Sequence, residues 1–136
     1  MRKIQLLLIM ALIAFAGCGK DNFFDKYPPE VLFYQDADVV NADFNAIILA
    51  TGVNQFIVKA RVSAPYKLKE IKIYSSVDGF TTNTLLNTFS DFTLTPNVIK
   101  VSSTLTNITV ATVVKIVATD MNNHVTTKLF NITVTP

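Results

Sequence analysis

Apolar and polar residues alternate with a period of two through most of the chain, and this pattern limits the possible folds more than any other feature. Residues 55–64 show it most clearly, with one face made of Phe56, Val58, Ala60 and Val62 and the other of Ile57, Lys59, Arg61 and Ser63. Such alternation is typical of a strand with one buried and one solvated face. No stretch after residue 17 shows the period of an amphipathic helix. The sequence therefore predicts an all-β domain.

Turn residues divide this region into short strands of similar length. We expect strands at residues 46–50, 55–64, 68–76, 84–89, 92–94, 99–105, 113–119 and 124–134. Within residues 68–76, alternation places Ile71 and Ile73 inside and Leu68 on the solvated face with Glu70 and Tyr74. Short strands at near-regular spacing favour a sandwich of two antiparallel sheets. Residues 31–34 can add an edge strand to this domain, pair with a neighbour or stay unpaired.

The N-terminus carries the pattern of a secretory signal. Arg2 and Lys3 precede an apolar run at residues 4–16, and small residues then lead to Cys18, the only cysteine. A basic region, an apolar region and a small-residue cleavage site predict export and removal of the segment. Because the apolar run is shorter than the ~20 residues of a bilayer-spanning helix, we do not expect a permanent transmembrane anchor.

The residues at this junction, Phe15, Ala16, Gly17 and Cys18, resemble the lipobox of bacterial lipoproteins, with Phe15 where that pattern usually has Leu. The charged residues 19–22 that follow are similar to the tethers of surface-exposed lipoproteins of Bacteroidota. The resemblance implies that the Cys18 thiol is acylated, for example with palmitate. It also implies an outer-membrane location, with display at the cell surface as one option. The alternative is an ordinary cleaved signal peptide followed by a free cysteine.

The body of the chain has its own resemblance. An apolar strand is followed by the sequence Lys-Glu-Ile-Lys-Ile-Tyr at residues 69–74 and by an Asp-headed hairpin at the C-terminus. This order resembles bacterial immunoglobulin-like modules, which implies two packed antiparallel sheets in Greek-key order. We therefore divide the chain into a lipoprotein signal peptide (1–17), an acidic, aromatic tether (18–42) and an immunoglobulin-like β-sandwich domain (43–136).

Charge and cysteine content narrow the possible partners and the source of stability. The net charge of +2 comes from Arg2 and Lys3, which leave with the signal peptide, so the side-chain charges of the mature chain balance. A nucleic-acid partner is not expected, because such domains are usually strongly basic. A single cysteine allows no intramolecular disulfide, and stability must therefore come from burial of apolar side chains.

Few residues suggest catalysis. His124 is the only histidine and lies beside an expected hairpin turn, and no Gly-x-Ser-x-Gly elbow is present. One histidine gives a poor zinc site. Asp120 with Asn122 and Asn123 would be a poor calcium site, because it offers a single carboxylate. We assign no catalytic residue, metal or cofactor, interpret Asp120 and His124 as turn residues, and expect the chain not to be an enzyme.

The candidate binding residues are Tyr74, Val77 and Phe80. Val77 and Phe80 flank a turn at Asp78 and Gly79, where they would form an apolar tip at the end of the domain away from the lipid anchor. Exposed apolar residues often mark interaction sites. The expected function is that of a lipid-anchored, non-catalytic binding or assembly module of the cell envelope, with a glycan or protein partner. The alternative is a structural spacer or an accessory subunit of an outer-membrane complex.

Overall fold

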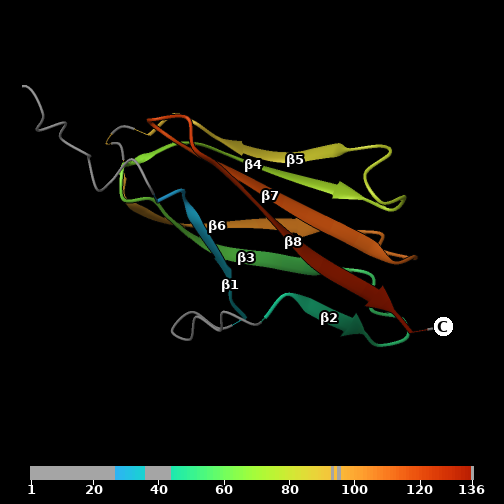
Figure 1. Cartoon of the computed structure of the whole chain (residues 1–136). Coiled ribbons are helices and arrows are strands. Elements are labelled where there is room, and N and C mark those ends of the chain that lie inside the picture. Colours follow the sequence, from blue (N-terminus) through green and yellow to red (C-terminus); the bar gives the residue numbers. More distant parts are fainter. Residues whose placement is uncertain (1–26, 36–43, 93, 95, 136) are drawn as a thin grey trace, which may run out of the picture.

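The structure, a computed structural model, describes residues 27–35, 44–92, 94 and 96–135 (Figure 1). Its described residues form eight strands: β1 (Glu30–Phe33), β2 (Ala46–Leu49), β3 (Phe56–Ser63), β4 (Leu68–Ser76), β5 (Thr84–Phe89), β6 (Val98–Leu105), β7 (Thr112–Asp120) and β8 (Val125–Val134). The prediction of an all-β domain is confirmed. Within the same residues, no helix is long and apolar enough to cross a membrane. The signal peptide and Cys18 lie outside the described residues.

The strands form two sheets that face each other. One sheet has the order β1-β3-β6 and the other the order β2-β8-β7-β4-β5. Neighbouring strands are antiparallel except for β2 and β8, which are parallel. Because β1 and β2 belong to different sheets, the chain crosses between the two layers near its start (Figure 1). The predicted sandwich of two packed sheets is thus confirmed.

Strand β1 settles the question that the sequence left open at residues 31–34. It pairs with β3 in the register Glu30↔Ser63 to Phe33↔Ala60. The Tyr34 amide then donates a hydrogen bond to the Lys59 carbonyl at 3.1 Å. Val31 and Phe33 of β1 are buried. This part of the expected tether therefore docks on its own domain and forms one edge of the smaller sheet.

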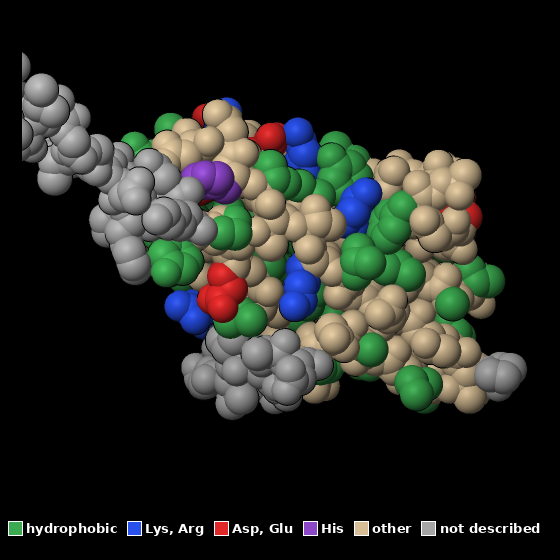
Figure 2. All heavy atoms as spheres, viewed as in Figure 1, with side chains coloured by type: hydrophobic (Ala, Val, Ile, Leu, Met, Phe, Trp, Pro, Cys, Tyr) green, Lys and Arg blue, Asp and Glu red, His purple; other side chains and the backbone are tan. Residues whose placement is uncertain are grey.

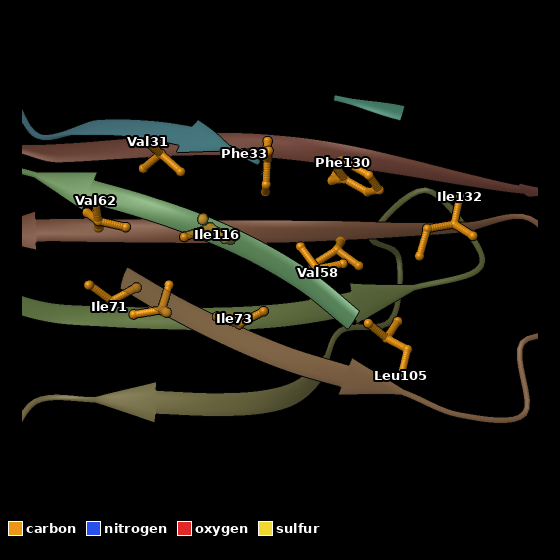
Figure 3. Packing of buried hydrophobic residues seen from close by; sticks show 14 of the residues in the cluster. Val31, Phe33, Val58, Val62, Ile71, Ile73, Leu105, Ile116, Phe130 and Ile132 are labelled. Atoms are coloured by element: carbon orange, nitrogen blue, oxygen red, sulfur yellow. The ribbon is translucent and has the colours of Figure 1, made fainter. Parts of the chain in front are cut away.

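Phe130 of β8 lies at the centre of the core (Figure 3). Its ring is fully buried, and the ring centroids of Phe33 and Phe44 lie 5.1 Å from it, with Phe56 stacked at 5.6 Å. Both sheets contribute to this contact, because Phe33 and Phe56 belong to the smaller sheet. Burying an aromatic side chain of this kind stabilises a fold by about 1.5–3 kcal/mol through apolar area alone.

Two details of the strand prediction are wrong. Leu68 was expected on the solvated face and is instead fully buried. A β-bulge between Leu68 and Glu70 inserts an extra residue, and an extra residue turns the side chains before it to the other face. Phe92 and Leu94, expected in a strand, lie outside any strand. They belong to the connection from β5 to β6, where the carbonyl of Pro96 accepts a hydrogen bond from the Leu68 amide at 2.7 Å.

The strand registers define two ends of the sandwich. At the tether end, Glu30 pairs with Ser63, Leu68 pairs with Asp120, and the Met121 amide donates to the Lys67 carbonyl at 3.0 Å. At the distal end lie the turn at residues 51–54, the β4–β5 loop and the end of β8. The chain from Cys18 enters the fold at Glu30, so the tether meets the sandwich at the tether end.

Candidate functional site

The structure brings two of the three candidate binding residues together around a lysine. Tyr74 projects from β4, Phe80 from the β4–β5 loop and Lys115 from β7. The Lys115 Nζ lies 4.4 Å from the centroid of the Phe80 ring and 5.1 Å from that of the Tyr74 ring. It also donates a hydrogen bond to the Asn83 Oδ1 at 3.1 Å. Cation–π contacts of this geometry are favourable, so the cluster ties the loop to the outer face of the larger sheet.

Asp78 organises the loop that carries Phe80. Its Oδ1 accepts a hydrogen bond from the Ser76 hydroxyl at 2.6 Å, and both carboxylate oxygens accept from the Thr82 amide at 3.0 Å. The Ser76 Oγ in turn accepts a hydrogen bond from the Phe80 amide at 2.9 Å. The hydrogen bonds from Ser76 and then Thr82 lower the pKa of Asp78 to about 2 from an ordinary 3.8, because they stabilise its ionised form.

Phe80 adopts a backbone conformation that bulky residues rarely take. Its φ is +69°, in the left-handed region that costs L residues other than Gly, Asn and Asp about 1–2 kcal/mol. The bonds of Ser76 and Asp78 hold the loop in this form. Backbone strain of this kind is maintained only where the surrounding structure fixes it, and it often accompanies a binding or catalytic role. The loop therefore holds the Phe80 backbone in this conformation through its own hydrogen bonds.

The pKa of Asp78 gives a prediction for the pH dependence of stability. A group whose pKa is lowered on folding stabilises the protein above its unfolded pKa and loses that contribution as the pH falls through its folded pKa. For Asp78 this window runs from 3.8 down to about 2. We expect the melting temperature of the wild type to fall more across this window than that of Asp78→Asn. Asp91→Asn, which alters an exposed carboxylate of the β5–β6 connection, is the control and should behave as the wild type.

Alternation along the strands could have revealed two further residues of this surface. Leu85 pairs with Tyr74 across β4 and β5 and is 53% exposed, and Lys115 pairs with Tyr74 across β4 and β7. Lys115 is the only charge in an otherwise apolar stretch at residues 113–119, which is the signal that sequence reasoning missed. Val77 does not join the cluster but is 66% exposed beside it. We name the surface made by Tyr74, Val77, Phe80, Leu85 and Lys115 the distal patch.

Figure 2 shows exposed hydrophobic side chains, in green, beside blue lysine or arginine side chains on one face of the molecule. The distal patch has this mixed composition. Val77 and Leu85 provide apolar area open to solvent, while Lys115 is half-buried with its Nζ against the two rings. An arrangement of this kind offers apolar contact to a partner.

Asp120 and His124 form a pair at the opposite end of the sandwich. The Asp120 side chain is fully buried, and its Oδ2 lies 2.8 Å from the His124 Nδ1. Its Oδ1 accepts hydrogen bonds from the amides of Asn122 at 2.9 Å and His124 at 2.8 Å. The turn role expected for Asp120 is thus present, but its complete burial and its contact with the histidine ring were not expected.

A carboxylate on Nδ1 orients an imidazole and leaves Nε2 for proton transfer or metal binding. Within the described part of the chain, no group of three or more His, Cys, Asp and Glu side chains could hold a metal ion. The pair is also remote from the distal patch. Strand β4 has nine residues and, at ~3.3 Å per residue, separates the two ends by about 26 Å. His124 therefore does not act on a group held at Phe80.

A shallow hollow opens at the tether end between the edges of β5 and β6. Its volume is about 310 Å³, and it is lined by Thr88, Phe89, Ser90, Asp91, Phe92 and Ile99. One exposed carboxylate at the mouth of an apolar hollow provides little specificity. Ligand sites usually combine an apolar pocket with several convergent polar groups. We therefore do not assign the hollow as a site.

No protein-family model and no curated protein sequence matches this chain. Among solved structures, a variant of the superoxide reductase (neelaredoxin) from Ignicoccus hospitalis aligns with a TM-score of 0.51 at 12% identity, over 83% of this chain and 86% of that one. The reductase itself gives a TM-score of 0.49 at 11% identity, with coverages of 80% and 81%. An LPMO from Kitasatospora papulosa gives 0.48 at 12% identity, over 68% of this chain and 51% of that one, so this chain spans about half its length. At such identities the likeness shows a β-sandwich fold alone.

These comparisons correct the functional prediction. The sequence led us to expect a non-catalytic binding or assembly module, or a structural spacer or accessory subunit, and not an enzyme. The superoxide reductase variant, whose sandwich is similar, is an enzyme, so neither this fold nor the lack of familiar motifs excludes catalysis. The inference failed because it equated missing hydrolase and zinc motifs with missing activity, whereas one fold hosts many unrelated sites. That prediction is wrong.

Proposed function

We propose that this chain is a lipid-anchored protein of the bacterial outer membrane, displayed at the cell surface, which contacts a protein of the cell envelope through the distal patch. The observation that carries this proposal is the position of the patch. The tether from the lipobox-like Cys18 enters at Glu30, and the patch lies at the other end of β4. The arrangement would direct the patch away from the lipid anchor.

The strand order supports an immunoglobulin-like Greek-key assignment for the sandwich. The order β1-β3-β6 corresponds to strands A, B and E of that fold, and β8-β7-β4-β5 corresponds to G, F, C and C′. The first strand of the fold would then be divided, with β1 in one sheet and β2 beside β8 in the other. This topology places both ends of β4 in exposed loops, where partners of sandwich domains can reach them.

Exposed apolar side chains favour a protein partner over a polysaccharide. Val77 and Leu85 are 66% and 53% exposed and lie beside the ring of Phe80. Protein interfaces are centred on well-packed apolar and aromatic residues surrounded by polar ones. The three threonines and the asparagine of residues 81–84 would supply such a polar rim. A membrane contact is already provided by the lipid anchor, and nucleic acid is not a proposed partner.

The proposal predicts that Phe80→Asn weakens partner contact without loss of fold. Asn tolerates the left-handed backbone at this position, so the melting temperature should change little while the ring is removed. The measurement is cross-linking in cells with a photoreactive amino acid at Val77 of the full chain. We expect a discrete protein adduct, with a several-fold lower yield in the Phe80→Asn background.

The matched control carries the photoreactive group at Thr104, which is exposed on β6 of the smaller sheet. It should give no adduct of the same mass. Equal yields with and without Phe80, or no adduct at Val77, would contradict the proposal. If the wild type binds insoluble envelope polysaccharide and Phe80→Asn does not, the partner of the distal patch is a glycan and not a protein.

A further inference from the structure

We propose that the tether end of the sandwich docks directly on the lipid surface, with Tyr66 and Met121 among the lipid headgroups and Lys67 and Lys69 facing their phosphates. This inference rests on the proposed lipid anchor. The docking would add a second, non-covalent contact with the membrane, and this contact would fix the orientation of the domain.

Two neighbouring loops present the apolar side chains of this end. Tyr66, in the β3–β4 loop, is 44% exposed, and Met121, in the β7–β8 turn, is 46% exposed. The hydrogen bond from the Met121 amide to the Lys67 carbonyl holds the two loops together. Tyr27 and Leu94, exposed by 47% and 85%, belong to segments that reach the same end. Tyrosine suits the membrane interface because its ring is apolar and its hydroxyl polar.

The charges of the two loops suit an anionic surface. Lys67 and Lys69 flank the buried Leu68 at the start of β4, and the Lys69 Nζ donates a hydrogen bond to the Asn123 Oδ1 at 2.7 Å. Asp120, which pairs with Leu68, is fully buried, and Glu70, next to Lys69, forms an ion pair with Lys72. The exposed carboxylates at this end, Glu30 and Asp91, belong to other segments than these two loops. Lysines beside a membrane are attracted to anionic headgroups. In the β4–β5 loop at the distal end, by contrast, the charged residue is Asp78.

The length of the tether selects the lipid surface rather than another occupant. Tyr27 is the first described residue, and the chain from Cys18 to Tyr27 can span at most ~30 Å at ~3.3 Å per residue. An acylated Cys18 would hold the tether end within that distance of the membrane, whereas the distal end lies a further β4 length away. The lipid anchor and the docked tether end reinforce each other, because the anchor raises the local concentration of the domain at the membrane surface.

Tryptophan fluorescence can test the docking, because the chain has no tryptophan of its own. The full-length, acylated variants Tyr66→Trp and Val77→Trp would each be reconstituted into vesicles of phosphatidylethanolamine and phosphatidylglycerol that contain brominated lipid. We expect blue-shifted, bromine-quenched emission from the Tyr66→Trp variant. The Val77→Trp variant, which reports on the distal end, should give unshifted and unquenched emission.

The outcomes separate the docking from the anchor. If the protein floats with the vesicles but the Tyr66→Trp variant emits like the Val77→Trp variant, the anchor stands and the docking is wrong. If the wild type does not float, the anchor is wrong and the docking falls with it. Adding Lys67→Glu and Lys69→Glu to Tyr66→Trp should reduce the quenching several-fold while flotation persists. Unchanged quenching in this variant would contradict the role of the lysines.

Discussion

Phe130→Ala should lower the free energy of unfolding by about 3–5 kcal/mol, the usual cost of removing a buried phenylalanine. The Phe130 ring is fully buried and contacts the rings of Phe33, Phe44 and Phe56, which come from different parts of the chain. Its removal leaves a cavity between the two sheets that stiff strands cannot collapse to fill. Urea denaturation of the wild type and the variant, followed by circular dichroism, measures the difference.

Leu129→Ala is the matched control. Leu129 precedes Phe130 on β8, is 44% exposed and points to the outer face of the larger sheet. Its truncation should cost well under 1 kcal/mol, because surface substitutions away from special features rarely exceed about 0.5 kcal/mol. Similar losses in the two variants would contradict the placement of Phe130 at the centre of the core.

Alternation was sufficient to predict most of the strands and their buried faces. Residues 55–64 and 68–76 lie within one or two residues of the observed β3 and β4, and Ile71 and Ile73 are buried as expected. Alternation failed at Leu68 because a β-bulge changes the side-chain phase, and no local sequence signal marks the extra residue. It also could not decide whether residues 31–34 pair with the domain, since that depends on contacts far apart in the sequence.

The candidate surface was predictable only in part. Val77 and Phe80 were identified from the turn at Asp78 and Gly79, but the partner of the Phe80 ring was not. Lys115 lies 35 residues after Phe80 in the sequence and contacts its ring only because β7 pairs with β4. The positive φ of Phe80 could not be predicted either, because glycine is the residue that usually adopts this conformation. Sequence patterns report local geometry, whereas this site is made by long-range strand pairing.

Cys18→Ala should abolish lipid labelling of the protein and stop normal processing at this site. The thiol of Cys18 is the only one in the chain, so no other thiol can be acylated in its place. Stable anchoring by acylation takes more than one acyl chain. The chain itself should remain folded, because Cys18 precedes the first described strand by more than ten residues. Phe80→Asn, altered at the distal end, is the control and should be labelled and processed as the wild type is.

Palmitate incorporation into the wild-type protein is the most direct test of lipid anchoring, on which the orientation of both ends of the sandwich depends. Cells that express the full chain would be grown with a palmitate analogue carrying an alkyne group, and the purified protein would be examined for the label. We expect label on the wild type and on Phe80→Asn, and none on Cys18→Ala. A wild-type protein that is exported and cleaved but carries no label would contradict it.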